Sequence, residues 1–114
     1  MAKLHPTISL PSKLQVSGLT IALRCQEQLQ EIADDEGSYH AGKQLIVFDE
    51  AIIRQQSSYS CILVWHELFH VIYEQYNLKE KKEEDTVNAM SRGIVQILKD
   101  NPQLKKWMDQ CLKK

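Results

Sequence analysis

The sequence predicts one α+β domain in which a small antiparallel sheet is followed by three helices. The chain has 114 residues, which is an ordinary length for a single domain. Strand-like alternation of apolar and polar residues lies in the first half, and a long segment without glycine or proline opens the second half. Strands that come first and helices that come afterwards are typical of α+β folds.

The predicted sheet lies between residues 19 and 49, after an irregular first stretch. Residues 19–25 alternate between apolar and more polar side chains, which is the period of a half-buried strand. Residues 34–38 are rich in turn formers and should separate this strand from a β-hairpin. The hairpin arms, 38–41 and 44–49, flank Gly42-Lys43, and the apolar run 45–48 is expected to be covered on both faces.

Three helices are predicted after the sheet. Residues 51–76 contain no glycine or proline and indicate one helix that ends near Asn77. A second helix is expected over residues 80–99, ending before Asn101-Pro102. Apolar residues spaced by three and four positions over 104–112 indicate a short amphipathic helix.

Composition excludes several functional classes. The formal net charge of −1 argues against nucleic-acid binding, which usually requires a basic excess on one face. No secretory signal is visible, and no window approaches the roughly 18 apolar residues of a membrane span. We therefore expect a cytoplasmic protein without a membrane partner. The three cysteines, at wide spacing and without a CxxC pair, are expected to be small buried apolar groups.

The most informative segment is 61–73, CILVWHELFHVIY. Ten of its thirteen residues are apolar, so we expect a buried helix in which the polar residues need partners. His66 and His70 are four residues apart and would share one helix face, where both rings can reach one zinc ion. Glu67 is turned by about 100° and would flank the metal as the general base of an HExxH site.

A catalytic zinc normally has a third protein ligand, which must come from elsewhere in the chain. The acidic cluster 83–85 would open the second helix, and a helical hairpin would bring that turn back over the motif. If Val87 is the centre of the buried face, Glu83 and Glu84 lie on either side of it and Asp85 points away. Spacing alone leaves Glu83 and Glu84 as alternatives.

Residues 66–102 carry HELFH, then Asn77-Leu78, then EDTVNAM from Glu84, then Gly93, and finally QILKDNP. This segment resembles small phage-type members of the ImmA/IrrE-like zinc metallopeptidase group. The resemblance implies a minimal zincin-like fold and Glu84 as the third metal ligand, with Val87 in place of the alanine of the family pattern. Phe69 stands where many members have glycine, so the shape of the cleft is expected to differ.

The resemblance also implies two further parts of a peptidase site. The strand 45–48 would form the upper edge of a cleft, where a peptide could add as another strand. An oxyanion-stabilising donor would come from four residues that one sequence cannot rank, namely Tyr73, Tyr76, His40 and Arg92. Tyr73 is expected to serve packing rather than catalysis.

Two functions follow as expectations. The leading hypothesis is a zinc-dependent peptidase acting on a protein or peptide, with His66, His70 and Glu84 as metal ligands and Glu67 as the catalytic base. The alternative is a catalytically silent, zinc-stabilised interaction module that binds a phage or mobile-element regulator. A metal-free helical interaction domain is a third possibility, and the oligomeric state stays open.

Overall fold

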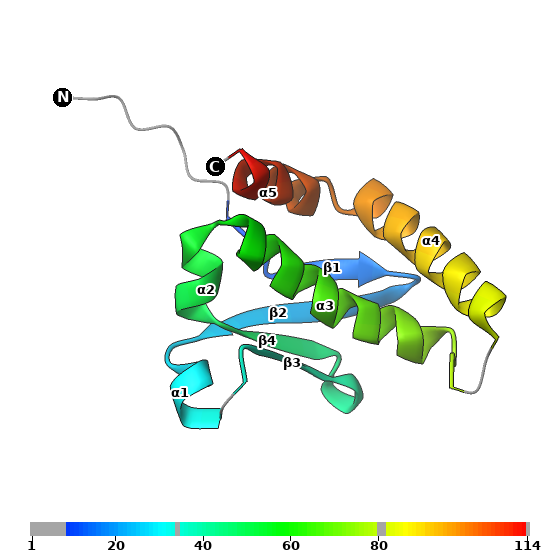
Figure 1. Ribbon diagram of the computed structural model, residues 1–114, viewed down its shortest axis with the longest axis horizontal. Coiled ribbons are helices and arrows are strands. Elements are labelled where there is room, and N and C mark those ends of the chain that lie inside the picture. Colours follow the sequence, from blue (N-terminus) through cyan, green and yellow to red (C-terminus); the bar gives the residue numbers. More distant parts are fainter. Residues whose placement is uncertain (1–8, 34, 80–81, 114) are drawn as a thin grey trace.

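The α+β class is confirmed. The computed structural model describes residues 9–33, 35–79 and 82–113. One four-stranded sheet is covered on one face by helices, and a short helix lies beside its other face (Figure 1). In chain order the elements are β1 (Lys13–Val16), β2 (Leu19–Gln26), α1 (Leu29–Ala33), β3 (Gly37–His40), the 3-10 turn η1 (Ala41–Lys43), β4 (Leu45–Asp49), α2 (Glu50–Gln55), α3 (Ser58–Gln75), α4 (Glu83–Asp100) and α5 (Pro102–Leu112).

The sheet is mixed, so the prediction of an antiparallel sheet was wrong. Its strand order is β1-β2-β4-β3. β1 and β2 form one antiparallel hairpin, β3 and β4 form another, and the two hairpins join through the parallel pair β2 and β4. The alternation of apolar and polar residues along a strand indicates which side chains are buried. It does not indicate whether the neighbouring strand runs parallel or antiparallel.

The predicted hairpin over residues 38–49 is confirmed, with η1 at its turn. The run 45–48 is buried on both faces, as expected. Ile46 and Phe48 belong to the main core, whereas Leu45 and Val47 pack with Leu29 of α1 on the other face. β1 was missed because it has only four residues, although its Leu14 and Val16 are buried. The short helix α1 was not predicted either.

The predicted helix over residues 51–76 is two helices. α2 ends at Gln55, the next residue, Gln56, has a φ of 48°, and α3 starts after Ser57. The Ser57 hydroxyl accepts a hydrogen bond from the Ser60 amide, and the Ser60 side chain accepts one from the Ser57 amide, which forms a capping box. A local cap therefore begins a new helix where periodicity alone indicated continuation.

α4 packs against α3 through a face that is not centred on Val87, which corrects the assumption made from the sequence. Its buried residues are Ala89, Gly93 and Ile97, whereas Val87 is 50% exposed. A methyl group added at Gly93 would lie 2.6 Å from Cδ1 of Ile72, so the absence of a side chain there permits close approach of the two helices. The described part of α4 starts at Glu83, and the predicted start at residue 80 lies outside the described residues.

The C-terminal helix was predicted correctly. α5 starts at Pro102, and its Trp107 and Met108 are buried in the main core. Of the three cysteines, Cys61 and Cys111 are buried as expected, but Cys25 is exposed. In the described part of the chain, no helix has the length and apolar character needed to cross a membrane.

Candidate metal centre

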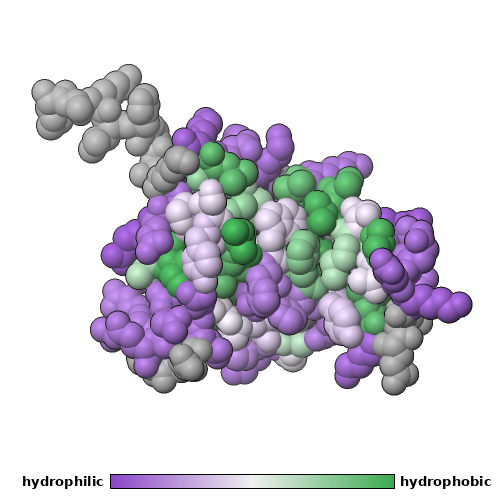
Figure 2. Space-filling view, in the orientation of Figure 1, coloured by the Kyte–Doolittle hydropathy of each residue, from purple (hydrophilic) through white to green (hydrophobic). Residues whose placement is uncertain are grey.

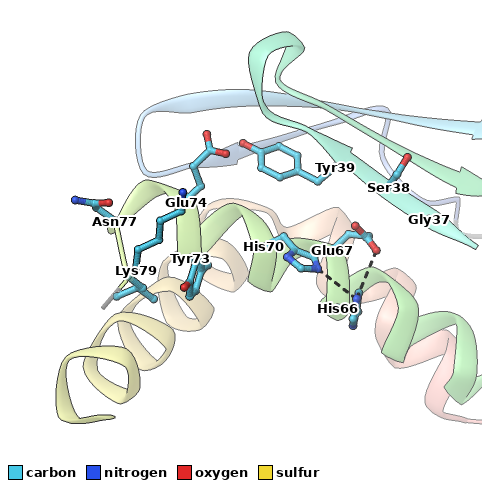
Figure 3. Close-up of a pocket in the computed structure, with 11 residues that line it drawn as sticks. Gly37, Ser38, Tyr39, His66, Glu67, His70, Tyr73, Glu74, Asn77 and Lys79 are labelled. Atoms are coloured by element: carbon cyan, nitrogen blue, oxygen red, sulfur yellow. Dashed lines mark hydrogen bonds and ion pairs between the residues drawn. The ribbon is translucent and has the colours of Figure 1, made fainter. Parts of the chain in front are cut away.

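Two histidines meet on the surface of α3. Because His66 and His70 are one helical turn apart, their rings meet edge to face, with 5.0 Å between the centroids. The two Nε2 atoms are 3.3 Å apart, and both rings are exposed to solvent. Figure 3 shows the two imidazoles converging next to Glu67.

Their separation fits a shared metal ion. Two nitrogen ligands that each lie 2.0–2.1 Å from a tetrahedral zinc are about 3.3–3.4 Å apart, which is the spacing of these two Nε2 atoms. The same spacing also permits a long hydrogen bond between two neutral rings, since one can donate and the other accept. The pair therefore supplies half of a tetrahedral donor set and needs at least one further ligand.

Glu67 lies behind the pair and is buried. Its Oε2 is 3.9 Å from Nε2 of His66. Burial raises the pKa of the Glu67 carboxyl, and the charges of His66 and His70 counter part of that effect. A carboxyl group whose pKa is raised in this way can take and release a proton near neutral pH more readily than an exposed one.

Gly37 of β3 makes room for Glu67. A Cβ atom at position 37 would lie 3.3 Å from Cγ of Glu67 and 3.3 Å from Cδ1 of Leu63. Both contacts are tighter than ordinary van der Waals distance, so a side chain here would push the carboxylate or the helix away. The close approach of β3 to α3 therefore depends on this glycine.

The helix that carries the motif is buried on one side only, which corrects the prediction of a helix buried all round. Leu68 and Ile72 are completely buried in the core, and Trp65 packs against it. Ile62, Phe69 and Tyr73 are among the exposed hydrophobic residues. Hydrophobic surface accordingly appears over the middle of the helical face in Figure 2. The histidines thus stand at the surface, and only the glutamate is sheltered from solvent.

A cavity of about 560 Å³ adjoins the histidines, with β3 on one side and α3 on the other. In Figure 3 its lining residues surround the space between the strand and the helix. The lining combines the three motif residues with groups from the strand and from the end of α3; it comprises Gly37, Ser38, Tyr39, His66, Glu67, His70, Tyr73, Glu74, Asn77, Leu78 and Lys79.

The free edge of the sheet beside the histidines is β3, so the expectation that strand 45–48 forms the edge was wrong. β4 lies inside the sheet, between β2 and β3. The amide of Asp49 donates to the carbonyl of Glu36, which makes that pair a hydrogen-bonded one. Hydrogen-bonded and non-hydrogen-bonded pairs alternate in an antiparallel ladder, so the N–H and C=O groups of Gly37 and Tyr39 point away from β4.

The predicted third ligand does not join the histidines in this structure. Glu84 is exposed in the first turn of α4, and no group of three or more His, Cys, Asp or Glu side chains placed to hold a metal occurs among the described residues. Met90 is the α4 residue that lines a small hollow with His66 and His70. Glu83 precedes Met90 by two helical turns and lies on the same flank, whereas Glu84 is turned about 120° from it.

The four residues proposed as oxyanion donors fall in different places. Tyr73 is 41% exposed and lines the cavity beside the histidines, so it is not part of the buried core. Tyr76 and Arg92 line a separate cavity at α4. The fourth, His40, is exposed and bonds Oγ of Ser38 at 3.0 Å.

Sequence reasoning missed Tyr39 and Glu74, which also line the cavity. Glu74 follows His70 by four residues, and this spacing was visible in the sequence as a continuation of the histidine face. Tyr39 comes from the edge strand, and only the pairing of β3 places it there.

Comparisons of the chain with protein-family models, with curated proteins and with solved structures found no match.

Proposed function

We propose that the protein is a zinc-dependent peptidase. The observation that carries the proposal is the 3.3 Å separation of the His66 and His70 Nε2 atoms next to the buried Glu67. An open strand edge beside this group supports a peptide substrate, because main-chain groups at a sheet edge can hold an extended peptide.

In this proposal His66 and His70 hold the metal, and Glu84 completes the ligand set, as the family resemblance implies. A zinc ion bound there would polarise a carbonyl group and make water more acidic. Glu67 would accept the proton of the attacking water and then donate it to the departing amine. The exposed main-chain groups of Gly37 and Tyr39 would hold the peptide in extended form over the histidines.

Metal analysis and three variants test this function. Protein purified without a histidine tag should contain about one zinc per chain, and His66→Ala should lose both zinc and hydrolysis. Glu67→Gln should keep zinc and lose hydrolysis, because the amide cannot take a proton. Retained hydrolysis in Glu67→Gln would overturn the mechanism.

The third ligand has its own test. If Glu84 is the ligand, Glu84→Gln should weaken zinc binding by at least tenfold. Loss of a residue that only hydrogen-bonds a metal ligand already lowers metal affinity by about tenfold or more. Glu83→Gln serves as the matched neighbour and should bind zinc as the unaltered protein does. If Glu83→Gln weakens zinc binding and Glu84→Gln does not, Glu83 is the third ligand. Glu83 lies on the same side of α4 as Met90.

A catalytically silent zinc-binding module is the second candidate. This candidate keeps the histidine pair as metal ligands and gives Glu67 no part in proton transfer. A spectrum of cobalt-substituted protein separates the two, because a structural metal is closed by four protein ligands whereas a catalytic one keeps a position for water.

A further inference from the structure

The cavity beside His70 and the hollow beside Tyr59 adjoin each other, and together they are called the groove below. The cavity and the hollow, of about 560 and 320 Å³, share Gly37, His66 and Glu67. The groove therefore runs along the outer edge of β3, with the histidines near its middle. Its two ends have different chemistry, and this difference bears on which peptide it would accept.

One end of the groove carries a carboxylate without a described counter-ion. Glu74 lies on the His66 and His70 face of α3, and Figure 3 shows the ring of Tyr39 directed toward it. The ion pairs of the described residues are Arg54 with Glu50 and His66 with Glu67, so none involves Glu74. Lys79 also lines this end, and its ammonium group offsets part of the negative charge.

The other end of the groove combines apolar side chains with the carboxylate of Glu36. Its hollow is lined by Tyr59, Ile62 and Leu63, of which Ile62 is 62% exposed. The hydroxyl of Tyr59 donates a hydrogen bond to Glu36, which keeps the aromatic ring beside the start of β3. This end offers contact surface for a hydrophobic side chain, and among the described residues its Glu36 carboxylate, unlike that of Glu74, already accepts a hydrogen bond from a tyrosine hydroxyl.

The strand fixes how a peptide would present its side chains to these ends. A peptide that adds antiparallel to β3 would pair with Tyr39 first and with Gly37 two residues later. Residues opposite one another in an antiparallel pair point to the same face, and position 37 faces α3. The first and third residues of the peptide would therefore point toward α3, and the middle residue would point away.

We propose that the groove selects a peptide with the pattern basic–any–apolar, read from its N-terminal side, and that Glu74 is the residue that selects the basic side chain. The proposal rests on the peptidase function proposed above and adds its substrate class. The basic residue lies opposite Tyr39 and near Glu74, the apolar residue lies opposite Gly37 and near Ile62, and the cleaved bond falls between them, over the histidines.

The test compares two fluorescent peptides that differ only in lysine or glutamine at the first position of the pattern. Anisotropy measures binding to the Glu67→Gln protein loaded with zinc, and mass spectrometry measures cleavage by the unaltered protein. The lysine peptide should be preferred by about three- to fivefold, the size expected for an ion pair open to solvent. Glu74→Gln should abolish the preference, and Glu74→Lys should reverse it toward the glutamine peptide.

Two further variants sharpen the result. Lys79→Gln should increase the lysine preference, because it removes the competing positive charge. Asp109→Asn is the matched control, since it removes one exposed carboxylate on α5, outside the groove, and it should leave the preference unchanged.

The outcomes separate the two proposals. Cleavage without a lysine preference, or with a preference that survives Glu74→Gln, overturns the specificity and leaves the peptidase function standing. Binding that prefers lysine through Glu74 without any cleavage supports the specificity and counts against the peptidase. Absence of both binding and cleavage overturns both.

Discussion

The two edges of the sheet differ in whether their outward-pointing backbone groups form hydrogen bonds. At the β1 edge, the side chain of Asn101 accepts a hydrogen bond from the Gln15 amide at 2.9 Å and donates one to the Gln15 carbonyl at 2.9 Å. Gln96 accepts from the amide of Ser17 at 2.9 Å. At the β3 edge, the outward groups of Gly37 and Tyr39 have no hydrogen bond to another residue in the described part of the chain.

This difference indicates which edge is available for a partner. An unpaired strand edge is a template for further pairing, and proteins usually cover it. Here the amide side chain of Asn101 satisfies both outward groups of one β1 residue, as a neighbouring strand would do. The edge that remains open is the one beside the HExxH residues, and an open edge can pair with a further strand.

The largest expected effect concerns the helix that closes the β1 edge. Gly93→Val would place carbon atoms inside the space of Ile72, because even a single Cβ at position 93 would lie 2.6 Å from Cδ1 of that residue. We expect a loss of about 3 kcal/mol in the free energy of unfolding, measured with urea, because overpacking forces α4 away from α3. Ser91→Val, at an exposed position of α4, is the control. A loss of stability no larger than that of Ser91→Val would contradict the tight packing of α4 against α3 at Gly93.

Opening the closed edge should have the next largest effect. Asn101→Ala removes the two bonds to Gln15 and the bond to the carbonyl of Ile97. We expect a loss of about 2 kcal/mol, because backbone groups that are partly buried lose their partners. The exposed Asn88 of α4 provides the matched change, Asn88→Ala, which should alter stability by less than about 0.5 kcal/mol. Equal effects of the two changes would argue that Asn101 does not close the edge.

Filling the space between β3 and α3 should affect activity more than stability. Gly37→Val would press against Glu67 and Leu63, and we expect at least a tenfold loss of kcat/KM with about 1 kcal/mol of lost stability. Gly42→Val is the control, because a Cβ at Gly42 meets nothing within 4 Å. An active Gly37→Val protein would contradict the role of this close approach.

The smallest expected effect is a shift in the titration of Tyr39. Burial raises the pKa of its hydroxyl above the ordinary value, and the charge of Glu74 raises it further. The folded state therefore favours the neutral phenol, so this contribution to stability is present below about pH 10 and is lost as the pH rises above it. In Glu74→Gln the Tyr39 pKa should fall, which ultraviolet titration of tyrosinate measures against Tyr39→Phe. An unchanged titration would place Glu74 too far away to act on this end of the groove.

The sequence predicted those elements whose formation depends on residues close together in the chain. The α+β class, the hairpin over residues 38–49 and the helix over residues 104–112 could be predicted from periodicity and turn residues. The HExxH spacing placed His66, Glu67 and His70 correctly relative to one another, because helix geometry is the same wherever the helix lies. The break at Gln56 was missed, although Ser57 and Ser60 carried the signal of a helix cap.

Sequence by itself thus determined the histidine pair, its neighbouring glutamate and the helix that carries them. Only the tertiary structure decided that β3 is the free edge, that Gly37 admits Glu67 and that Tyr39 meets Glu74 in one groove. It also decided that Val87 is exposed, and it left Glu84 apart from the histidines. The physical reason is that helical spacing acts over a few residues, whereas strand pairing and helix packing join residues far apart in the chain and depend on which surfaces fit together.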